Sequence, residues 1–270
     1  MTSEPRLLLD TSLPPGRMVA SDDGSEDNQA LWLSDGPATP GLWALIRAEH
    51  ARSGLWPLLL DSQDPDDGEF RPWSSGEVSP ERMSSPGAHD PAGLLAQWWG
   101  EYTVTDDGDD VLPPAERAAV TAPFGPRWPG LAPARPAGPD PDEEAAEHAE
   151  FFVSLRPHVR LGLVPAASGA DALAVAGWEG PANYENDTAK FSAVLRTWEQ
   201  RFGARVVALG FDTLHLSIAV PPTRPEDALP IAAEHFAFCP DNIWQGSRTH
   251  TLASYAERLV DAHSWEFWWD

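Results

Sequence analysis

Residues 187–220 decide the fold class, and they read DTAKFSAVLRTWEQRFGARVVALGFDTLHLSIAV. Large apolar residues recur at helical spacing as far as Phe202, and Gly203 follows as a helix stop. Two apolar runs of strand length come next, with Gly210-Phe-Asp212 between them. The stretch therefore predicts a helix followed by an antiparallel hairpin. The helical stripe comprises Phe191, Val194, Leu195, Trp198 and Phe202, and the two strands cover 204–209 and 213–220.

The sequence on both sides extends this unit into a C-terminal domain over residues 142–270. An acidic start favours a helix over 140–153, because negative charge stabilises a helix N-terminus. The order β-α-β-β-α-α-β is typical of an α+β fold with a mixed or antiparallel sheet and helices mainly on one face, in the manner of a split βαβ arrangement. The further elements are a strand at 159–164, helices at 169–178, 225–238 and 249–262, and a terminal strand at 265–270.

Residues 1–112 predict a smaller N-terminal α/β region. Its clearest strand is the apolar run 55–60, and Pro57 favours an edge position for that strand, because proline cannot donate to a neighbouring strand. The segment 61–90 is rich in Asp, Ser, Pro and Gly and predicts a long loop. The other expected elements are a strand at 31–33, a helix from the Thr39 cap to Ala48, and a helix at 91–102 capped by Asp90.

A proline-rich segment separates the two parts. Nine prolines occur from Pro113 to Pro141 inclusive. Since proline lacks an amide donor and restricts the residue before it, the segment 113–141 is not expected to form a regular helix or a central strand. It predicts a partly extended linker.

Charge and cysteine content exclude several classes of protein. The chain of 270 residues carries 42 acidic and 18 basic side chains, a formal net charge of −24. Affinity for nucleic acid rests on clustered Lys and Arg, so no nucleic-acid partner is expected. The lone Cys239 excludes an internal disulfide and a cysteine-rich zinc site. The N-terminus has no basic start and no apolar run is long enough to span a bilayer, so we expect a cytoplasmic protein without membrane contact.

Tryptophan is unusually frequent, with 13 residues in the chain. Tryptophans commonly supply core volume and half-buried surface, and we favour that interpretation. The alternative is an exposed aromatic platform for a peptide, a sugar or a nucleotide.

The densest group of reactive side chains lies at residues 235–246. His235 and Cys239 are four residues apart, which places both on one face of a continuing helix. One hypothesis is a thiolate activated by His235, with Asp241 or Asp212 orienting the imidazole. The other is that Cys239 is a small buried hydrophobe and His235 a satisfied polar residue. We favour the second, because free cysteines are among the most buried residues and are usually inert.

Other patterns of metal ligands and catalytic residues are weak. A metal site would take His235, Cys239 and Asp241 with His215 or His250, but no metal and no cofactor is predicted. The segments Asp64–Glu69 and Asp106–Asp110 are acidic, lack the ligand spacing of an EF-hand, and are expected to be solvated loops. The sequence contains no glycine-rich phosphate loop followed by Lys, no His-Glu-x-x-His and no Gly-x-Ser-x-Gly.

Two polar residues of the hairpin are expected to have ordinary roles. His215 alternates with Leu214 and Leu216, so it lies on the opposite face of its strand, where we expect a solvent-side histidine. Asp212 is expected to form the turn. The side chains that remain as binding candidates are Asp212, His215, Asn242, Trp244, Gln245, Trp268 and Asp270.

Several long stretches of the C-terminal part occur in an order that resembles one protein family. They are Gly169–Trp178, Val194–Gly203, Val206–Leu216, Ala233–Asp241, Gln245–Gly246 and Trp265–Asp270. From about Leu161 to Asp270 the chain resembles the bacterial domain-of-unknown-function 4253 family, and Gly54–Leu60 resembles the front part of longer members. The composition resembles that of actinobacterial proteins. The family has no assigned activity, so the resemblance implies an identity without a mechanism.

The sequence supports hypotheses from different functional classes. We favour a non-catalytic binding or interaction module, with an immunity or defence role against a basic partner as one version, because a charge of −24 attracts cationic proteins and no recognised catalytic motif is present. The alternative is an enzyme that uses His235, Cys239 and Asp241 in a cleft roofed by tryptophans, which requires an exposed and acidic thiol. A third hypothesis is a small-molecule sensor with a tryptophan-lined pocket.

Overall fold

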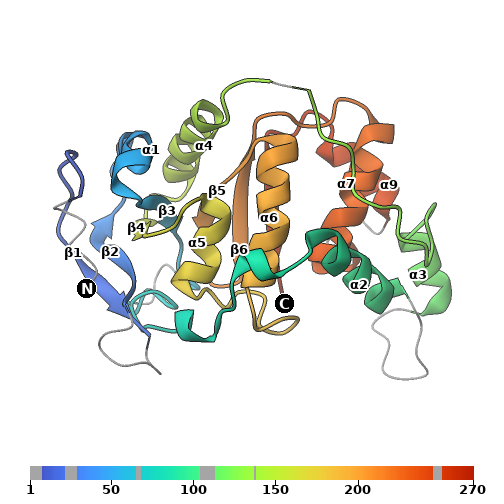
Figure 1. Cartoon of the computed structure of the whole chain (residues 1–270), viewed down its shortest axis with the longest axis horizontal. Coiled ribbons are helices and arrows are strands. Elements are labelled where there is room, and N and C mark those ends of the chain that lie inside the picture. Colours follow the sequence, from blue (N-terminus) through green and yellow to red (C-terminus); the bar gives the residue numbers. More distant parts are fainter. Residues whose placement is uncertain (1–7, 22–28, 65–67, 104–112, 137, 246–250) are drawn as a thin grey trace.

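The computed structural model describes residues 8–21, 29–64, 68–103, 113–136, 138–245 and 251–270. Its centre is a seven-stranded mixed sheet in the order β1-β2-β4-β3-β5-β6-β7 (Figure 1). The predicted α+β class with a mixed sheet is confirmed. The strands are β1 (Gly16–Ala20), β2 (Gln29–Pro37), β3 (Trp56–Leu60), β4 (Arg160–Val164), β5 (Ala204–Leu209), β6 (Thr213–Ile218) and β7 (Ser264–Trp268).

Helices cover both faces of this sheet. α1 and α4 pack on one face, and α5 and α6 pack on the other, where Figure 1 shows them in front of the strands. α2, α7 and α9 pack together beyond the β7 end of the sheet. No helix in the described ranges is both long and apolar enough to cross a membrane. The helices are α1 (Leu42–Ser53), α2 (Pro91–Thr103), α3 (Pro114–Val120), α4 (Pro141–Leu155), α5 (Gly169–Ala176), α6 (Ala189–Phe202), α7 (Pro225–Phe238), α8 (Asp241–Trp244) and α9 (Leu252–Leu259), with single 3₁₀ turns at Pro80–Arg82 and Pro86–Ala88.

The stretch that predicted the fold folds as expected. α6 ends at Gly203, which takes a left-handed conformation with φ of 63° and donates its amide to the carbonyl of Trp198. β5 and β6 then pair antiparallel across the short turn at 210–212. The buried face of α6 packs on the sheet through Trp198, whose ring stacks on Phe267 of β7 with centroids 5.4 Å apart.

The predicted edge position of the strand at 55–60 is wrong. β3 lies inside the sheet, antiparallel to β4 and parallel to β5. Pro57 is tolerated there because pairing with β5 begins only at Leu59, beyond the residue that lacks an amide. On the β5 side, the indole nitrogen of Trp56 donates to the carbonyl of Val206 at 3.0 Å and so supplies a bond that the backbone does not.

The N-terminal and C-terminal parts of the chain build one sheet. β4, which follows the proline-rich segment, lies between β2 and β3, which precede it. One apolar core accordingly contains residues as distant in sequence as Val19 and Trp269. Strands from before residue 112 and from after residue 142 therefore alternate within the same sheet.

The expectation that the segment 113–141 forms no regular helix is wrong for its first part. α3 occupies Pro114–Val120, with Pro113 and Pro114 confined to its start, where a missing amide has no consequence. The six residues after Pro114 contain no proline, so the helix can continue to Val120. Val120 and Ala132 are buried, which shows that the segment packs on the core rather than only spanning a gap.

A fully buried carboxylate fastens this segment to the core. The carboxylate of Glu234 on α7 accepts hydrogen bonds from both terminal nitrogens of Arg201, at 2.7 and 2.6 Å. It also accepts one from the indole nitrogen of Trp198 at 2.7 Å. It also accepts the backbone amide of Ala132 at 2.7 Å, while Arg201 donates to the carbonyl of the same residue. Charge pairing and hydrogen bonds together satisfy a charge that would otherwise be costly to bury.

Replacing Glu234 by Ala is expected to lower the free energy of unfolding by about 3–5 kcal/mol, because Arg201 then keeps an uncompensated charge in the core. Urea denaturation measures this loss. Glu226→Ala is the matched control, since Glu226 lies on the same helix and is 64% exposed, so its loss should change stability by no more than about 0.5 kcal/mol. Equal, small losses in both variants would contradict the assigned role of Glu234.

Candidate functional site

Cys239 and His235 are both buried, and each has a different partner. The thiol of Cys239 donates to the carbonyl of Trp268 at 2.9 Å. The Nδ1 atom of His235 is 3.1 Å from the hydroxyl of Tyr255. Burial raises the pKa of the Cys239 thiol far above its ordinary value, which is the opposite of activation. Burial, and then the charge of Arg201, lower the pKa of His235 well below its ordinary value.

Asp241, the third residue of the hypothesised catalytic group, has a structural role. Its carboxylate is fully buried and accepts four hydrogen bonds. The donors are the hydroxyl of Tyr184 at 2.6 Å, the side chains of Trp244 and Gln245 at 3.0 and 2.8 Å, and the backbone amide of Asp270 at 3.0 Å. Asp241 therefore joins α8 to the C-terminal end of the chain rather than orienting His235.

Asn242 closes the free edge of strand β7. Its side-chain nitrogen donates to the carbonyl of Glu266 at 2.6 Å, and its side-chain oxygen accepts the amide of Trp268 at 3.1 Å. The amide group thus bonds to β7 as a peptide group of a further strand would. Together with the thiol of Cys239 on the carbonyl of Trp268, it covers polar groups that an edge strand would leave open.

The side chains of His235, Cys239 and Asp241, the residues hypothesised for thiol catalysis, therefore bond to other partners and not to one another. Cys239 is 0% exposed, and its thiol faces a backbone carbonyl instead of an imidazole. His215 lies on strand β6, and His250 falls outside the described residues. Among the described residues no group of three or more His, Cys, Asp or Glu side chains could hold a metal ion.

The remaining binding candidates lie around the end of β7. Trp268 is 36% exposed, and its indole nitrogen donates to the carboxylate of Asp212 at 3.1 Å. The backbone amide of Asp270 donates to Asp241, and its backbone carbonyl accepts a hydrogen bond from the side chain of Asn183. Trp244 and Gln245 hold Asp241. Most of these side chains thus have a structural partner, and Trp268 alone presents a large apolar surface to solvent.

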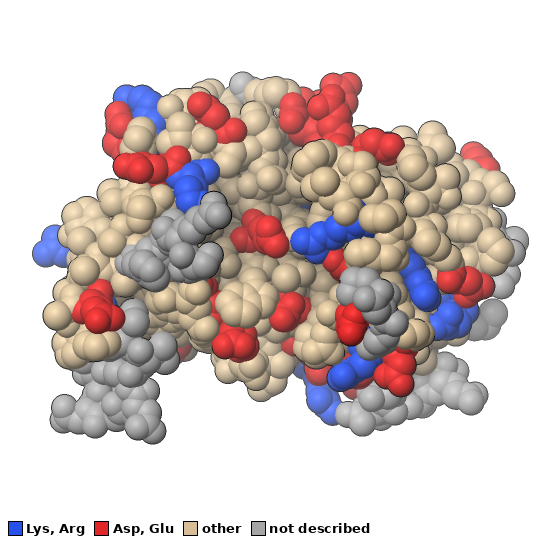
Figure 2. All heavy atoms as spheres, turned by 180° about the vertical axis from the view of Figure 1, so that it is seen from behind, with Lys and Arg blue, Asp and Glu red and all other residues tan. Residues whose placement is uncertain are grey.

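A groove of about 1050 Å³ lies next to these residues. Its lining comes from α4, from strands β6 and β7, and from α9. Of the predicted candidates, His215, Asp241, Asn242 and Trp268 contribute to it. The back of the molecule is hollowed near its middle, and acidic and basic side chains border the hollow (Figure 2).

Exposed apolar side chains gather at this groove. Phe151 and Leu155 on α4 are 58% and 64% exposed, and Trp268 of β7 lies in the same lining. They are three of the five large hydrophobic side chains that are exposed in the described part of the chain. Phe151 and Leu155 are four residues apart, so α4 presents both on one face. The helix predicted over 140–153 includes Phe151 but ends before Leu155, and its sequence pattern does not show that either side chain is exposed.

His215 lies below the groove and is buried. The expectation of a solvent-side histidine is therefore wrong. His215 does point away from Leu214 and Leu216, but Phe152 of α4 covers it with ring centroids 4.8 Å apart. Burial lowers the pKa of His215 to about 3, and the charge of Arg156 lowers it further. His148 is also held neutral, because burial lowers its pKa.

Two exposed side chains of opposite charge, Glu266 and Arg258, line the groove. The side chain of Glu266 is 60% exposed, and one of its carboxylate oxygens is 4.0 Å from Arg156 and from His215. Arg156 is engaged by Asp61 at 2.6 Å and lies over the ring of Phe152 at 4.9 Å. The groove therefore combines an apolar wall with the accessible carboxylate of Glu266 and the guanidinium of Arg258, which lies over the ring of Tyr255.

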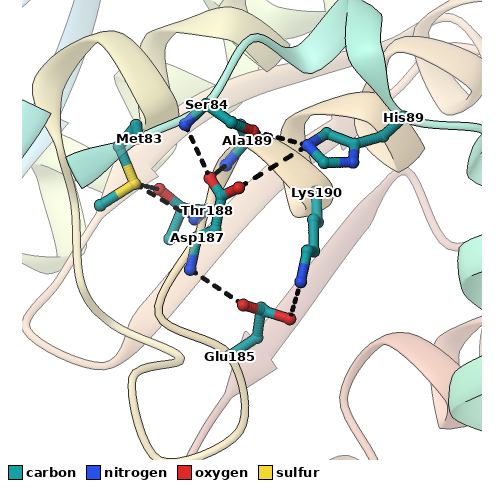
Figure 3. Close-up of polar contacts among 8 residues, drawn as sticks. All are labelled: Met83, Ser84, His89, Glu185, Asp187, Thr188, Ala189 and Lys190. Atoms are coloured by element: carbon teal, nitrogen blue, oxygen red, sulfur yellow. Dashed lines mark hydrogen bonds and ion pairs between the residues drawn. The ribbon is translucent and has the colours of Figure 1, made fainter. Parts of the chain in front are cut away.

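A second group of reactive residues has the composition of a hydrolase triad but not its geometry. Ser84 Oγ is 2.6 Å from His89 Nε2, and Asp187 Oδ2 is 3.6 Å from the same nitrogen (Figure 3). In a catalytic triad the carboxylate holds Nδ1, so that Nε2 can accept the serine proton. A carboxylate beside Nε2 instead favours a proton on that atom. Asp187 accepts the amides of Ser84 and Ala189, so this cluster joins the segment before α2 to the start of α6.

Residues 160–270 match the family model described as Domain of unknown function (DUF4253). This match confirms the resemblance of the C-terminal part. The DUF4253 region begins at β4 and includes the turn 239–242, α9 and β7, whereas α4 precedes it. The groove is therefore built from the DUF4253 region together with a helix outside it. No curated protein and no solved structure matches the chain.

Cys239 of the DUF4253 region is expected to resist a thiol-labelling reagent in the native protein, because its thiol is buried, has a raised pKa and donates to Trp268. Labelling should become complete only in denaturant. Rapid native labelling with a midpoint below the ordinary cysteine value of about 8.5 would contradict a structural thiol.

His235 is expected to make stability depend on pH. The unfolded chain binds a proton at this residue near pH 6.5, whereas the folded protein resists it, so stability is present above that pH and is lost as pH falls. The slope for one such histidine is about 1.4 kcal/mol per pH unit. Urea denaturation between about pH 7 and pH 5 should show a smaller slope in His235→Leu than in the wild type, and equal slopes would contradict the neutral buried imidazole.

Proposed function

We propose that this protein is a non-catalytic binding module that holds a segment of a partner protein in the groove between α4 and the β7–α9 part of the DUF4253 region. The observation that carries the proposal is that Phe151 and Leu155 of α4 are exposed and together form an apolar wall of the groove. Contiguous exposed apolar surface rimmed by polar residues is typical of interaction sites. A helix or an extended segment can fill a groove of this kind.

The chemistry of the groove favours a partner segment that combines apolar side chains with a Lys or Arg. Glu266 supplies a carboxylate that is 60% exposed beside that wall. The guanidinium of Arg156 is already paired with Asp61, and that of Arg258 lies over the ring of Tyr255 at 5.8 Å. The buried His215 and the half-buried His148 stay neutral at physiological pH, so they do not oppose a cation. α4 itself carries five acidic side chains and no Lys or Arg, which adds to the preference for a basic partner.

The overall charge supports the proposal less than the local charge does. On the face shown in Figure 2 acidic side chains form several separate patches with basic side chains between them. The net charge of −24 accelerates encounter with a cationic protein, and Glu266 is the specific contact. An immunity or defence role in the cytoplasm is one form of such binding.

The competing hypotheses have less support. Enzymatic use of Cys239 requires an accessible thiolate, and its thiol is fully buried with a raised pKa. A tryptophan-lined sensor requires several tryptophans around one cavity. Ten of the 13 tryptophans are buried in the core, and Trp268 is the one with substantial exposure.

Two surface substitutions test the proposal directly. The probe is a fluorescein-labelled helical peptide of Leu and Lys with the leucines at i, i+3, i+4 and i+7 spacing. Phe151→Ser/Leu155→Ser is expected to weaken its binding by about tenfold or more, because the apolar wall is lost. Fluorescence anisotropy measures the dissociation constant, and Glu266→Gln should weaken binding of the Leu-Lys peptide further.

The matched control is Leu45→Ser/Leu131→Ser, which removes two exposed apolar side chains that do not line the groove. It should leave the dissociation constant unchanged. Equal effects of both double variants, or tighter binding of a Leu-Glu peptide of the same spacing, would overturn the proposal for this partner chemistry.

A further inference from the structure

A smaller pocket of about 330 Å³ lies at the carboxyl ends of β3 and β5. These two strands are parallel neighbours, and Asp61 and Gly210 are the residues that directly follow them. In sheets with parallel strands, ligands commonly bind outside the carboxyl ends of the strands. The volume is at the lower end of the range for small-molecule sites.

One side of this pocket is built by a buried carboxylate that positions two basic side chains. Asp61 is 6% exposed and accepts Arg156 at 2.6 Å through one oxygen. Its other oxygen is 2.7 Å from Nε2 of His158 and also accepts the amide of Ser62 at 2.9 Å. Arg156 and His158 lie on the connection from α4 to β4, and their side chains are 35% and 34% exposed. Both side chains therefore reach solvent while Asp61 fixes their orientation.

The other side of the pocket carries a second carboxylate. Asp212 belongs to the tight turn between β5 and β6, where a Cβ atom on Gly210 would come within 2.2 Å of the Thr213 hydroxyl. The indole of Trp268 holds one oxygen of Asp212 at 3.1 Å, and the backbone carbonyl of Asp212 accepts the amide of Trp269. The turn thus presents an oriented carboxylate to the same pocket that Arg156 and His158 line.

We infer that this pocket binds a small zwitterion, with its anionic group on Arg156 and His158 and its ammonium group on Asp212. The Nε2 atom of His158 is bonded to Asp61, so Nδ1 is the ring nitrogen left for the ligand, and it donates to an anionic group when the ring is the imidazolium. An anion alone would meet Asp212, and a cation alone would meet Arg156, so a molecule that carries both charges satisfies the pocket best. This inference does not depend on the groove between α4 and α9, although Arg156 borders both.

Isothermal titration with a series of simple probes tests the inference. Glycine, β-alanine and 4-aminobutyrate present the two charges at increasing separation, and acetate and methylammonium present one charge each. At least one of the three zwitterions is expected to bind with a dissociation constant at or below about 1 mM, and at least tenfold more tightly than either single-charge probe. Absence of zwitterion binding at about 10 mM, or equal binding of acetate, would overturn it.

Asp212→Asn and His158→Asn assign the binding to this pocket. Each is expected to weaken the zwitterion by about tenfold or more, and Asn at position 212 can still accept the Trp268 indole, so the turn is retained. His89→Asn is the control, because His89 is likewise paired with an aspartate but lies outside the pocket. Unchanged affinity in both pocket variants would overturn the assignment. Phe151→Ser/Leu155→Ser should keep the zwitterion site intact, so the two proposals fail separately.

Discussion

Closure of the β7 edge is the constraint on which the rest of the C-terminal structure depends. An edge strand exposes unpaired amides and carbonyls, and it invites pairing with other chains. Here Cys239 at the end of α7 and Asn242 on α8 bond to the backbone of Glu266 and Trp268, while Asp241 accepts the amide of Asp270. The turn after α7 therefore fixes where β7 ends, and with it the wall of the groove that β7 and α9 provide.

The same contacts explain why reactive residue types occur together without reactive geometry. A thiol, an imidazole and a carboxylate are concentrated at 235–241 because this turn must satisfy many polar groups inside the core. Its neighbours Glu234 and Arg201 form a second buried network that reaches the proline-rich segment. Accessible chemistry lies instead where the chain leaves α4, since Arg156 borders both the apolar groove and the polar pocket at the ends of β3 and β5.

Local patterns predicted part of this structure, and distant partners decided the rest. The helix ending at Gly203 and the following hairpin were predictable because periodicity, stop and turn lie within one stretch. The interior place of β3 was not, because the bonds that tolerate Pro57 come from β4 and β5, far along the chain. At the site, the four-residue spacing predicted His235 and Cys239 on one face of a continuing helix, but α7 ends at Phe238 and Cys239 lies just beyond it. Tyr255 and Trp268 then determine the partners of the two side chains. The groove was missed because α4 supplies a wall whose exposure depends on packing.

Amide hydrogen exchange at β7 tests the central claim most directly. Glu266 and Trp268 turn their backbone groups toward Asn242, so by alternation Phe267 bonds to β6. The account predicts that the amides of Trp268 and Phe267 are both strongly protected in the native protein, and that Asn242→Ala selectively releases the amide of Trp268. Rapid exchange at Trp268 beside a protected Phe267 in the wild type would contradict closure of this edge, and with it the structural role assigned to the turn at 239–242.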